Sequence, residues 1–439
     1  MIFFLYNIIL FIAASLAVPY YLLKMALTGK YRRSLGAKFG MIREELFLTM
    51  EGAPRIWIHA VSVGEVTAAA PIVAALRAEL PGACIVLSTS TETGQDMAGS
   101  LAKEATAIIY YPLDIPFVVR KVIDRVNPDV FVMTETELWP NFLHACKERN
   151  IKVIMVNGRI SPRSFRRYRL SRFFWKRVLK FVNRVGVISD VDGKRILSLG
   201  LPPERMEIMG NAKYDGLAAK VSPALEEEVA KRLNIAPEEQ VFVAGSTHEG
   251  EESVVLDVYR RLLADYPAMK LILIPRHVER GAAVRDIVER SGFSDVVTLS
   301  AINGGQRRRS ERIIVVDVIG ELFKIYSLAT VVFCGGSLVP KGGQNILEPA
   351  AWGKVVFHGP SMDDFLSEKN ILAGIGAGIT VADGEELLAG VRTMLSQPAL
   401  LKAKGEAARK AIIANRGAAK RYAGMIMETL RRPHSWDRR

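Results

Sequence analysis

Residues 55–90 read RIWIHAVSVGEVTAAAPIVAALRAELPGACIVLSTS, and this stretch decides the fold class. Ile56–Ala60 and Cys84–Ser88 are short apolar runs rich in β-branched residues, and a helical pattern through Pro71–Leu80 lies between them. Runs of this length joined by one helix are typical of parallel strands with a crossover helix. The stretch therefore predicts one strand–helix–strand unit of an α/β sheet.

The same alternation continues along the chain in two series, separated by a looser segment at residues 202–223. The other strand-like runs of the first series are Ala107–Tyr111, Asp129–Met133, Lys152–Val156 and Val185–Ile188. Those of the second series are Val241–Ala244, Lys270–Ile274, Val296–Leu299, Ile313–Val316, Val331–Cys334 and Val355–His358. A single helical pattern over residues 400–430 follows. We predict an α/β protein with two doubly wound, Rossmann-like domains.

Composition narrows the class of protein and the class of partner. The chain has 439 residues, 49% of them hydrophobic and 24% charged, which excludes disordered and collagen-like proteins. Lys and Arg number 59 against 46 Asp and Glu, so the net charge of +13 favours nucleic acid, a phosphorylated substrate or a membrane surface as partner. Cys84, Cys146 and Cys334 lie in or beside apolar runs without metal-ligand spacing, so we expect buried thiols.

The N-terminus is apolar over about the length of a helix that crosses a bilayer, because no charged side chain precedes Lys24. We predict a membrane anchor over residues 1–27. A cleaved signal peptide would begin with basic residues, which are missing here, and a buried core helix is the other alternative. Five basic residues and no acidic one lie between Lys24 and Lys38, so the positive-inside rule places the rest of the chain in the cytoplasm.

Carboxylates gather in two loops that follow predicted strands, at the edge of a parallel sheet where ligands bind. Glu65 stands at the start of the helix after the first strand, and Glu135 and Glu137 follow Asp129–Met133. A glutamate held there can accept the proton of a sugar hydroxyl, and a pair of carboxylates can orient an acceptor or share a proton. The alternative is structural, since a carboxylate near a helix N-terminus complements the helix dipole.

Residues 159–184 hold ten basic residues and no acidic one, with six aromatic residues interleaved. This composition suits nucleic acid as well as a segment that lies among lipid headgroups. The predicted anchor favours the membrane, so we expect no nucleic-acid partner. The residues expected to dock on the membrane are Arg166, Arg167, Arg169 and Arg172. A solvated helix face is the alternative, in which the aromatic residues need a core to fill.

Glycine-rich and polar loops follow strands in the second half of the chain. Gly245–Glu252 supplies main-chain donors at a helix start, and His248 within it has no second histidine at metal-ligand spacing. Arg276 would pair with a phosphate or stack on a base, or else form a surface salt bridge. Two glycine pairs in residues 334–349 let the main chain approach a phosphate.

The last of these loops is neither a GxGxxG nor a Walker motif, which argues against dehydrogenases and P-loop ATPases. Ser337 and Asn345 add hydrogen-bond donors to it, and a helix is expected to begin near Asn345. Glu348 would accept both ribose hydroxyls of a nucleotide, or else complete a capping box with Asn345. The backbone of residues 316–322 would read a base edge.

Eight segments then combine in one order: the apolar N-terminus, Ser62-Val-Gly-Glu65, Glu135-Thr-Glu-Leu-Trp-Pro140, Asn157-Gly-Arg-Ile-Ser161, Lys213-Tyr-Asp215, Gly245-Ser-Thr-His-Glu-Gly-Glu-Glu252, Pro275-Arg-His277 and Gly342-Gly-Gln-Asn-Ile-Leu-Glu-Pro349. Together they resemble the 3-deoxy-D-manno-octulosonic acid (Kdo) transferases of lipid A assembly. The resemblance covers nearly the whole chain and implies the two-domain GT-B glycosyltransferase fold. Gln344 and Val278 depart from it, since many members have His and Pro there.

The resemblance implies inverting transfer of Kdo from CMP-Kdo to a lipid A precursor (lipid IVA), with no metal or other cofactor. Glu65 matches the general base, and Glu137 and Glu135 match residues that organise the acceptor or Kdo. The matching donor-binding positions are Arg276, His277, Val318, Ile319, Gly320, Gly336, Ser337, Asn345 and Glu348. The expected acceptor- or Kdo-binding positions are Ser62, Gly64, Ser246, Thr247, His248 and Lys213.

The resulting prediction has four parts: an anchor at residues 1–27, an acceptor-binding domain at 28–214, a CMP-sugar-binding domain at 215–425 and a basic tail at 426–439. The partners are CMP-Kdo, the lipid A precursor and lipids of the inner membrane, where we expect the enzyme to be tethered. The alternatives are a GT-B enzyme of the cell envelope with a UDP-sugar donor, and a non-catalytic, membrane-tethered nucleotide-binding protein.

Overall fold

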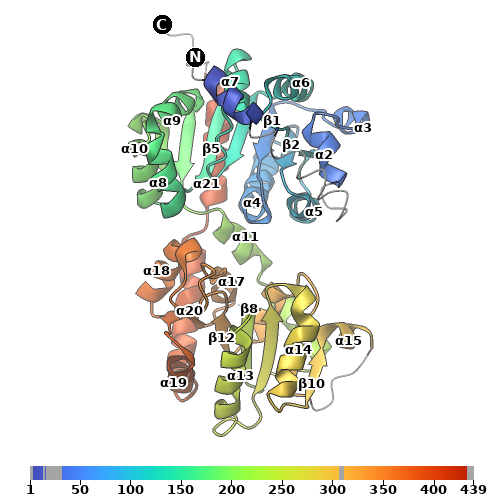
Figure 1. Ribbon diagram of the computed structural model, residues 1–439, viewed down its shortest axis with the longest axis vertical. Helices are drawn as coiled ribbons and strands as arrows, with labels where there is room; N and C mark the ends of the chain where they lie inside the picture. Colours follow the sequence, from blue (N-terminus) through green and yellow to red (C-terminus); the bar gives the residue numbers. More distant parts are fainter. Residues whose placement is uncertain (1–2, 13–14, 16–31, 306–310, 433–439) are drawn as a thin grey trace. The chain divides into compact units, whose positions relative to one another are not determined.

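Two parallel sheets organise the protein in the computed structural model, which describes residues 3–12, 15, 32–305 and 311–432 (Figure 1). Unit 1 comprises Met1–Gly216 and Asn415–Arg439, and unit 2 comprises Leu217–Ala414. Each unit contains one sheet of seven strands, and all strand pairs are parallel. The predicted α/β class with two doubly wound sheets is confirmed.

Unit 1 is built on a sheet whose order is β3-β2-β1-β4-β5-β6-β7. Its strands are β1 (Arg55–His59), β2 (Cys84–Thr89), β3 (Ala107–Tyr110), β4 (Val130–Thr134), β5 (Lys152–Gly158), β6 (Arg184–Val187) and β7 (Met206–Ile208). Its helices are α2 (Arg32–Lys38), α3 (Glu44–Leu48), α4 (Val63–Glu79), α5 (Glu92–Leu101), α6 (Pro116–Val126), α7 (Pro140–Glu148), α8 (Pro162–Leu170), α9 (Arg172–Val178), α10 (Asp190–Ser198) and α21 (Ala418–Arg431), and α11 (Lys213–Lys220) leads into unit 2.

Unit 2 is built on a sheet whose order is β10-β11-β9-β8-β12-β13-β14. Its strands are β8 (Val241–Thr247), β9 (Lys270–Pro275), β10 (Val296–Thr298), β11 (Ile313–Val315), β12 (Val331–Cys334), β13 (Val356–His358) and β14 (Gly378–Thr380). Its helices are α12 (Pro223–Leu233), α13 (Glu251–Leu262), α14 (Gly281–Arg290), α15 (Leu299–Asn303), α16 (Leu322–Ile325), α17 (Leu347–Ala351), α18 (Leu366–Gly374), α19 (Gly384–Leu395) and α20 (Pro398–Ala414).

The strand order fixes where each unit can bind a ligand. The winding reverses between β1 and β4 in unit 1 and between β8 and β12 in unit 2. Doubly wound sheets bind ligands beyond the carboxyl ends of the strands at such a switch point. The loops that follow these four strands carry most of the predicted site residues, and the others follow β7, β9 and β11.

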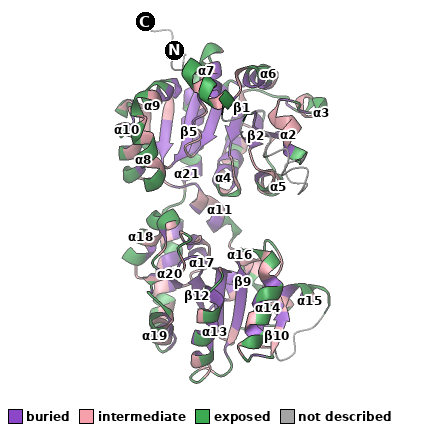
Figure 2. Ribbon diagram, viewed as in Figure 1, coloured by how far each residue is buried: buried purple, intermediate pink, exposed green. Residues whose placement is uncertain are grey.

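The central strands are buried on both faces, which explains why they read as continuous apolar runs (Figure 2). The edge strands β7 and β14 were not predicted. Two of the three residues of β7 are exposed, and β14 is a three-residue strand that begins at a glycine. With sequences of Met-Glu-Ile and Gly-Ile-Thr, these two strands carry too few apolar residues to be recognised by pattern.

The predicted C-terminal helix is two helices that belong to different units. The chain breaks between α20 and α21, where Gly417 has φ +90°. Tyr422 and Ile426 of α21 are buried in the core of unit 1, beside α4 and the central strands (Figure 1). The structure therefore differs from the predicted boundary at residue 425, because helical periodicity marks a buried face without saying which core covers it.

Side chains of unit 1 hold both ends of α21. The Asp215 carboxylate accepts the N–H groups of Gly417 and Ala419 at 2.6 and 3.0 Å. At the other end, Lys152 Nζ donates to the carbonyl oxygens of Thr429 and Leu430 at 2.8 and 3.1 Å. An acid at the N-terminus and a base at the C-terminus both complement the helix dipole.

Asp215→Ala should lower the free energy of unfolding by about 1–2 kcal/mol, because two N–H groups at the start of α21 lose their acceptor. Urea unfolding of the full chain, followed by circular dichroism, measures this loss. Lys420→Ala is the matched control on the exposed face of α21 and should change stability by less than about 0.5 kcal/mol. Equal stability of the two variants would mean that Asp215 does not cap the helix.

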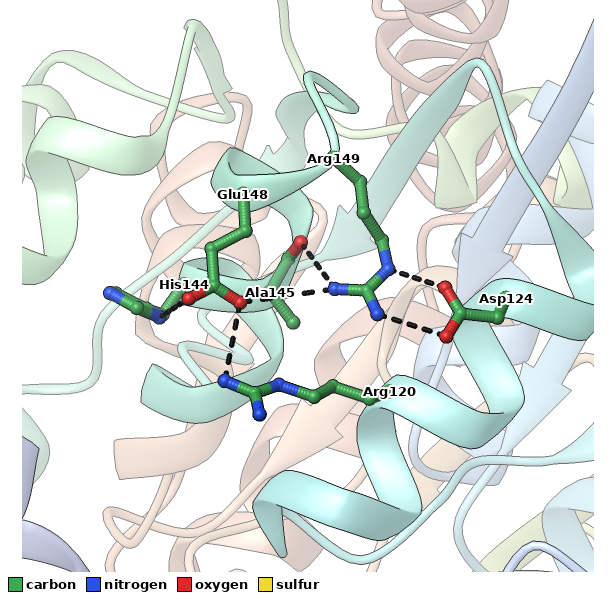
Figure 3. Close-up of polar contacts among 6 residues, drawn as sticks. All are labelled: Arg120, Asp124, His144, Ala145, Glu148 and Arg149. Carbon is green, nitrogen blue, oxygen red and sulfur yellow. Dashed lines mark hydrogen bonds and ion pairs between the residues drawn. The ribbon is translucent and has the colours of Figure 1, made fainter.

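The surface between α6 and α7 carries an ion-pair network (Figure 3). Arg149 donates to both carboxylate oxygens of Asp124 at 2.6 and 2.9 Å. Glu148 lies 3.5 Å from Arg120 and 3.5 Å from His144. Partly exposed pairs of this kind contribute about 0–1 kcal/mol each, so buried apolar residues of these helices supply most of the packing energy.

Residues 3–12 form a helix that packs on unit 1. The Tyr6 hydroxyl donates to Asp114 Oδ2 at 2.9 Å, and Asn141 Nδ2 donates to Asn7 Oδ1 at 2.7 Å. The other face of the helix is exposed and apolar, and it carries Phe4, Leu5, Ile8, Ile9, Phe11 and Ile12.

Most of the rest of the predicted anchor, residues 1–27, lies outside the described residues. Within the described part of the chain, every helix is too short or too polar to cross a bilayer. The anchor therefore stays a prediction. What the structure adds is a helix that contacts α7 and α9 through Phe3 and Tyr6 and leaves its other, apolar face exposed.

The basic and aromatic stretch at residues 159–184 separates into two faces. Five of its six aromatic residues pack against the core of unit 1, namely Phe165, Tyr168, Phe174, Trp175 and Phe181. Phe173 alone among the six is largely exposed, at 67%. The expectation that these aromatic residues lie among lipid headgroups is therefore wrong for five of them, because they fill a core. The four arginines predicted to dock are all exposed.

Candidate functional site

Glu65 lies in the first turn of α4, directly after the switch-point strand β1. Its side chain is 7% exposed. One carboxylate oxygen accepts the N–H of Val61 at 2.8 Å, and the other accepts the hydroxyl of Ser62 at 3.2 Å. The helix start therefore holds a buried carboxyl group in one orientation, at the end of the sheet where ligands bind.

Glu135 and Glu137 come from the loop after β4, on the other side of the switch point. Glu135 has φ +59°, a conformation uncommon for a residue with a side chain, and its N–H donates to the carbonyl of Val156. The indole N–H of Trp139 donates to Glu137 Oε2 at 3.1 Å. Local backbone strain of this kind is typical of functional loops.

The three carboxyl groups lie close enough to perturb one another. Burial, and after it the neighbouring carboxylates of Glu137 and Glu135, raise the pKa of Glu65 to about 8, against the Val61 and Ser62 donors, which lower it. Burial together with Glu135 raises the pKa of Glu137 to about 7, against the Trp139 donor. Pairs of carboxyl groups with raised pKa values are a mark of acid–base sites.

Lys213, at the start of α11, brings a positive charge to this cluster. Its Nζ lies 3.1 Å from Glu135 Oε1. A Cβ built on Gly64 would lie 4.0 Å from both Lys213 Nζ and Ser62 Oγ. The structure therefore brings together Ser62, Gly64, Glu65, Glu135 and Lys213, all predicted site residues from three separate loops of unit 1.

Predicted site residues of the second half that follow β8 and β9 lie near the switch point of unit 2. The rings of His248 and His277 are 6.0 Å apart, centroid to centroid. Burial lowers the pKa of His248, the positive charges of His277, Lys341 and Arg276 lower it further, and Glu251 opposes them. The side chains of Arg276, His277 and Lys341, which follow β9 and β12, therefore lie near enough to His248 to act on its charge. Lys341 was not predicted as a site residue.

The main-chain donors of the glycine loop after β12 already have a partner. Glu251, at the start of α13, accepts the N–H groups of Gly336 and Ser337 at 2.7 and 3.0 Å. The Ser337 hydroxyl donates to the carbonyl of Cys334 and accepts the N–H of Gly359. The expectation that these donors face a phosphate is therefore corrected: a buried carboxylate of the protein takes the place of the anion.

The neighbouring residues after β8 are likewise bound within the fold. Thr247 is fully buried, and its hydroxyl donates to Glu252 Oε1 at 3.0 Å. Arg280 donates to the same oxygen at 2.7 Å. Ser246 is buried with φ +56°. Of Ser246, Thr247 and His248, which were expected to contact Kdo, the first two are buried and His248 is half-buried.

Asn345 and Glu348 are bonded to each other, although not as a capping box. Asn345 Nδ2 donates to Glu348 Oε1 at 3.1 Å, while Asn345 Oδ1 accepts the N–H of Leu347. A capping box would instead join the Glu348 carboxylate to the backbone N–H of Asn345. Burial raises the pKa of Glu348, and Asn345, Lys220 and Arg276 lower it, so the carboxylate lies in the field of the basic cluster.

The loop at residues 317–321 leaves one large apolar side chain in solvent. Ile319 is 81% exposed, between a half-buried Val318 and an exposed Gly320. Asp317 anchors the loop by accepting the N–H and the hydroxyl of Ser300. An apolar surface of this size suits the face of a base.

Among the residues that the structure describes, no group of three or more His, Cys, Asp or Glu side chains is arranged to hold a metal ion. The three cysteines are free and buried, as predicted. Sequence reasoning missed Glu251, although the string Gly245–Glu252 contains it. Its position directly after Gly250, at a helix start, was the available signal.

Comparison with known proteins agrees with this arrangement. A family model described as 3-deoxy-D-manno-octulosonic-acid transferase (kdotransferase) matches residues 33–216. The chain is 30% identical to a 3-deoxy-D-manno-octulosonic acid transferase of Haemophilus influenzae, over 98% of this chain and 99% of that protein. It is 29% identical to one of Chlamydia pneumoniae, over 84% of each.

A solved glycosyltransferase of Rickettsia africae has the same fold. The TM-score is 0.58 at 17% sequence identity, over 86% of this chain and 98% of that one. At this identity the likeness concerns the fold alone, and it agrees with a GT-B arrangement of two Rossmann-like units. The near full-length relative of Haemophilus influenzae and the family model show that the chain belongs to the family of 3-deoxy-D-manno-octulosonic acid (Kdo) transferases, which are glycosyltransferases.

Proposed function

We propose that this Kdo transferase uses CMP-Kdo as donor and a lipid A precursor, lipid IVA, as acceptor in lipopolysaccharide core biosynthesis, with Glu65 as general base. The Glu65 carboxyl group carries the proposal. It is buried at the switch point of unit 1, and its pKa is raised to about 8. A base is most efficient when its pKa lies near the working pH.

In the proposed step, an acceptor hydroxyl gives its proton to Glu65 while its oxygen attacks the anomeric carbon of Kdo. The bond from that carbon to the phosphate oxygen of CMP breaks, the electron pair leaves with CMP, and the configuration inverts. Val61 and Ser62 keep the carboxylate oriented for this transfer. Glu137 and the Glu135–Lys213 pair would orient the acceptor or Kdo by hydrogen bonds.

The basic cluster of unit 2 is the proposed site for the negative charges of the donor. Arg276, His277, His248 and Lys341 offer positive charge and hydrogen-bond donors for a phosphate and a sugar carboxylate. Charge of this kind stabilises a leaving phosphate as its negative charge develops. We assign the Glu348 carboxylate and the Asn345 amide to the ribose, and residues 318–320 to the cytosine.

The proposed acceptor is a lipid, so the enzyme has to work at a membrane surface. Two features support tethering at the cytoplasmic face of the inner membrane. The first is the exposed apolar face of the helix at residues 3–12, and the second is the exposed set of Arg166, Arg167, Arg169 and Arg172 on α8 and α9. Apolar side chains and arginines are the two groups that bind a protein to anionic lipid.

A turnover assay tests the donor and the acceptor together. Purified protein is incubated with lipid IVA and a system that generates CMP-Kdo, and the mass of the lipid product is measured by mass spectrometry. We expect the lipid mass to increase by whole Kdo residues. Transfer from a UDP-sugar instead would favour another GT-B activity, and nucleotide binding without any product would indicate a binding protein.

The pH dependence of the rate tests the role of the carboxylate cluster. Because Glu65 acts only when deprotonated, kcat/KM should rise tenfold per pH unit below about pH 8 and level off above it. Glu137→Gln removes a negative charge that raises the pKa of Glu65, so the rising limb should move to lower pH. The amide oxygen of this variant can still accept the Trp139 N–H, which preserves the loop.

Glu79→Gln, at the exposed end of α4, is the matched control and should leave the limb in place. A Glu137→Gln profile that coincides with that of the wild type would show that the titrating group is not Glu65. A shift to higher pH would have the same meaning, because removing a negative charge cannot raise the pKa of a neighbouring acid.

A further inference from the structure

Glu251 is a buried carboxylate whose bonding pattern is unusual in this protein. Glu251 is the first residue of α13 and is 1% exposed. It accepts four backbone N–H groups, those of His248 at 2.9 Å, Gly336 at 2.7 Å, and Ser337 and Leu338 at 3.0 Å each. A carboxylate can accept about four such bonds, so its capacity is filled.

These four bonds join two loops that come from neighbouring strands. His248 belongs to the loop after β8, and residues 336–338 belong to the loop after β12. The strands β8 and β12 pair directly at the switch point of unit 2. Glu251 therefore fixes both loops to one another at the place where a ligand of this sheet binds.

The glycine loop leaves no alternative way to satisfy its donors. A Cβ on Gly335 would lie 2.6 Å from the carbonyl oxygen of Ser246 and 2.8 Å from Glu251 Oε2, so the backbone passes directly against the carboxylate. Gly336 has φ +66°. Without the carboxylate, three consecutive N–H groups, two of them on the buried residues Gly336 and Ser337, would lose their acceptor, which is costly for a folded loop.

The same loop sets the position of the His248 ring. A Cβ on Gly336 would lie 3.2 Å from His248 Cδ2 and 3.3 Å from Gln344 Nε2, so the ring packs on the bare backbone of the glycine. The His248 Nε2 atom is buried and has no hydrogen-bond partner among the described residues. Glu251 thus acts on His248 twice, through its backbone N–H and through the surface on which its ring rests.

We propose that Glu251 is a positioning residue for the sugar-nucleotide donor: by holding residues 336–338 and the backbone of His248, it keeps the His248 side chain in the geometry that receives the anionic groups of that donor. This inference rests on the proposed function of the basic cluster. Glu251 itself does not contact the donor, because all its bonds are to the protein. Its effect reaches the donor through the His248 ring, which rests on the glycine loop.

The test measures KM for the donor, KM for the acceptor and kcat in the full chain. Glu251→Gln places an amide N–H₂ among backbone donors, so part of the clamp is lost. We expect KM for CMP-Kdo to rise about tenfold or more, while KM for lipid IVA stays within about twofold. A role in stability alone would lower the active fraction, and with it the apparent kcat, and would leave KM for the donor unchanged.

Glu368→Gln is the matched control. Glu368 is also a buried glutamate of unit 2, on α18, and its Oε2 has no hydrogen-bond partner among the described residues. We expect both KM values of this variant to stay within about twofold of the wild type. Thermal unfolding compares the two variants, and if Glu251→Gln does not fold, Glu251→Asp, which keeps the charge on a shorter side chain, takes its place.

A double-mutant cycle with His248→Ala shows the route of the effect. If Glu251 acts through His248, replacing it in the His248→Ala background should raise KM for the donor by less than about threefold. Fold-changes that multiply would overturn that route, and an unchanged donor KM in the single variant would overturn the proposal itself. If the wild type makes no product, the failure lies with the proposed donor and acceptor instead.

Discussion

Glu65→Gln should reduce kcat by about a hundredfold or more, because the acceptor hydroxyl loses the group that takes its proton. The amide keeps the size of the carboxylate and can still accept the N–H of Val61, so the first turn of α4 should stay in place. KM for the donor should not change, since the donor is assigned to unit 2. Steady-state rates with saturating donor and acceptor measure the loss.

Stability provides a check that the loss of rate is chemical. The pKa of Glu65 is raised from its ordinary value of 4.5 to about 8, so the folded state holds a proton that the unfolded chain releases in this pH window. Its contribution to stability therefore falls as the pH rises through the window. The amide of the Glu65→Gln variant does not titrate, so this variant should melt at the same temperature as the wild type or higher at pH 8.

Near-normal turnover of Glu65→Gln would remove Glu65 from the mechanism. A hundredfold loss with a much lower melting temperature would instead point to a structural role of the carboxylate at the helix start. Glu79→Gln, on the same helix, should match the wild type in both measurements. The combination of slower chemistry with undiminished stability is the result that a general base requires.

The sheets could be predicted from sequence because their strands are buried on both faces. The strand β1 and its neighbours consist of uninterrupted apolar residues, and burial alone explains this pattern. The edge strands β7 and β14 have no such pattern, because each has three residues, of which none in β7 and one in β14 is buried. The break before α21 was missed for a related reason, since one buried stripe looks the same whichever core it packs into.

The location of the site could be predicted for those residues that directly follow strands at a switch point. This reasoning placed Glu65, Glu135 and Glu137 together. In the structure, the carboxylates of Glu137 and Glu135 lie near enough to Glu65 to raise its pKa. The partner of the glycine loop could not be predicted. Glycines at 335 and 336 indicate that something approaches the backbone closely, and a phosphate and the carboxylate of Glu251 give the same pattern in sequence.

For the basic stretch at residues 159–184, too, the sequence does not determine which side chains face the protein and which face solvent. Aromatic and basic residues alternate in α8 and α9, and the sequence does not say which of the two kinds faces solvent. In the structure, Phe165 and Trp175 pack inward while the arginines point outward. Apart from the exposed Leu170 and Phe173, membrane docking by this stretch therefore depends on the positive charge of the arginines, and the response of binding to salt tests that dependence.

Reversal of three of these charges should weaken binding to anionic vesicles by about a hundredfold at low salt. Each arginine near an anionic surface contributes about 1 kcal/mol, so Arg166→Glu, Arg167→Glu and Arg169→Glu together remove at least about 3 kcal/mol. Co-sedimentation of the full chain with vesicles, with and without anionic lipid, measures this loss. Transfer to acceptor embedded in such vesicles should fall with it, while the affinity for CMP should not change.

The matched control replaces Lys402, Arg409 and Lys410 by Glu. These residues are exposed on α20 in unit 2, and their replacement changes the net charge by the same amount. If the α8–α9 arginines are the docking surface, this control should bind vesicles nearly as well as the wild type. Salt separates the two contributions, because it screens the arginines and leaves the apolar helix at residues 3–12 unaffected. Equally weakened binding of both triple variants to vesicles would mean that net charge acts without a docking site. Undiminished binding of the Arg166, Arg167 and Arg169 variant would mean that the acceptor reaches unit 1 at another face.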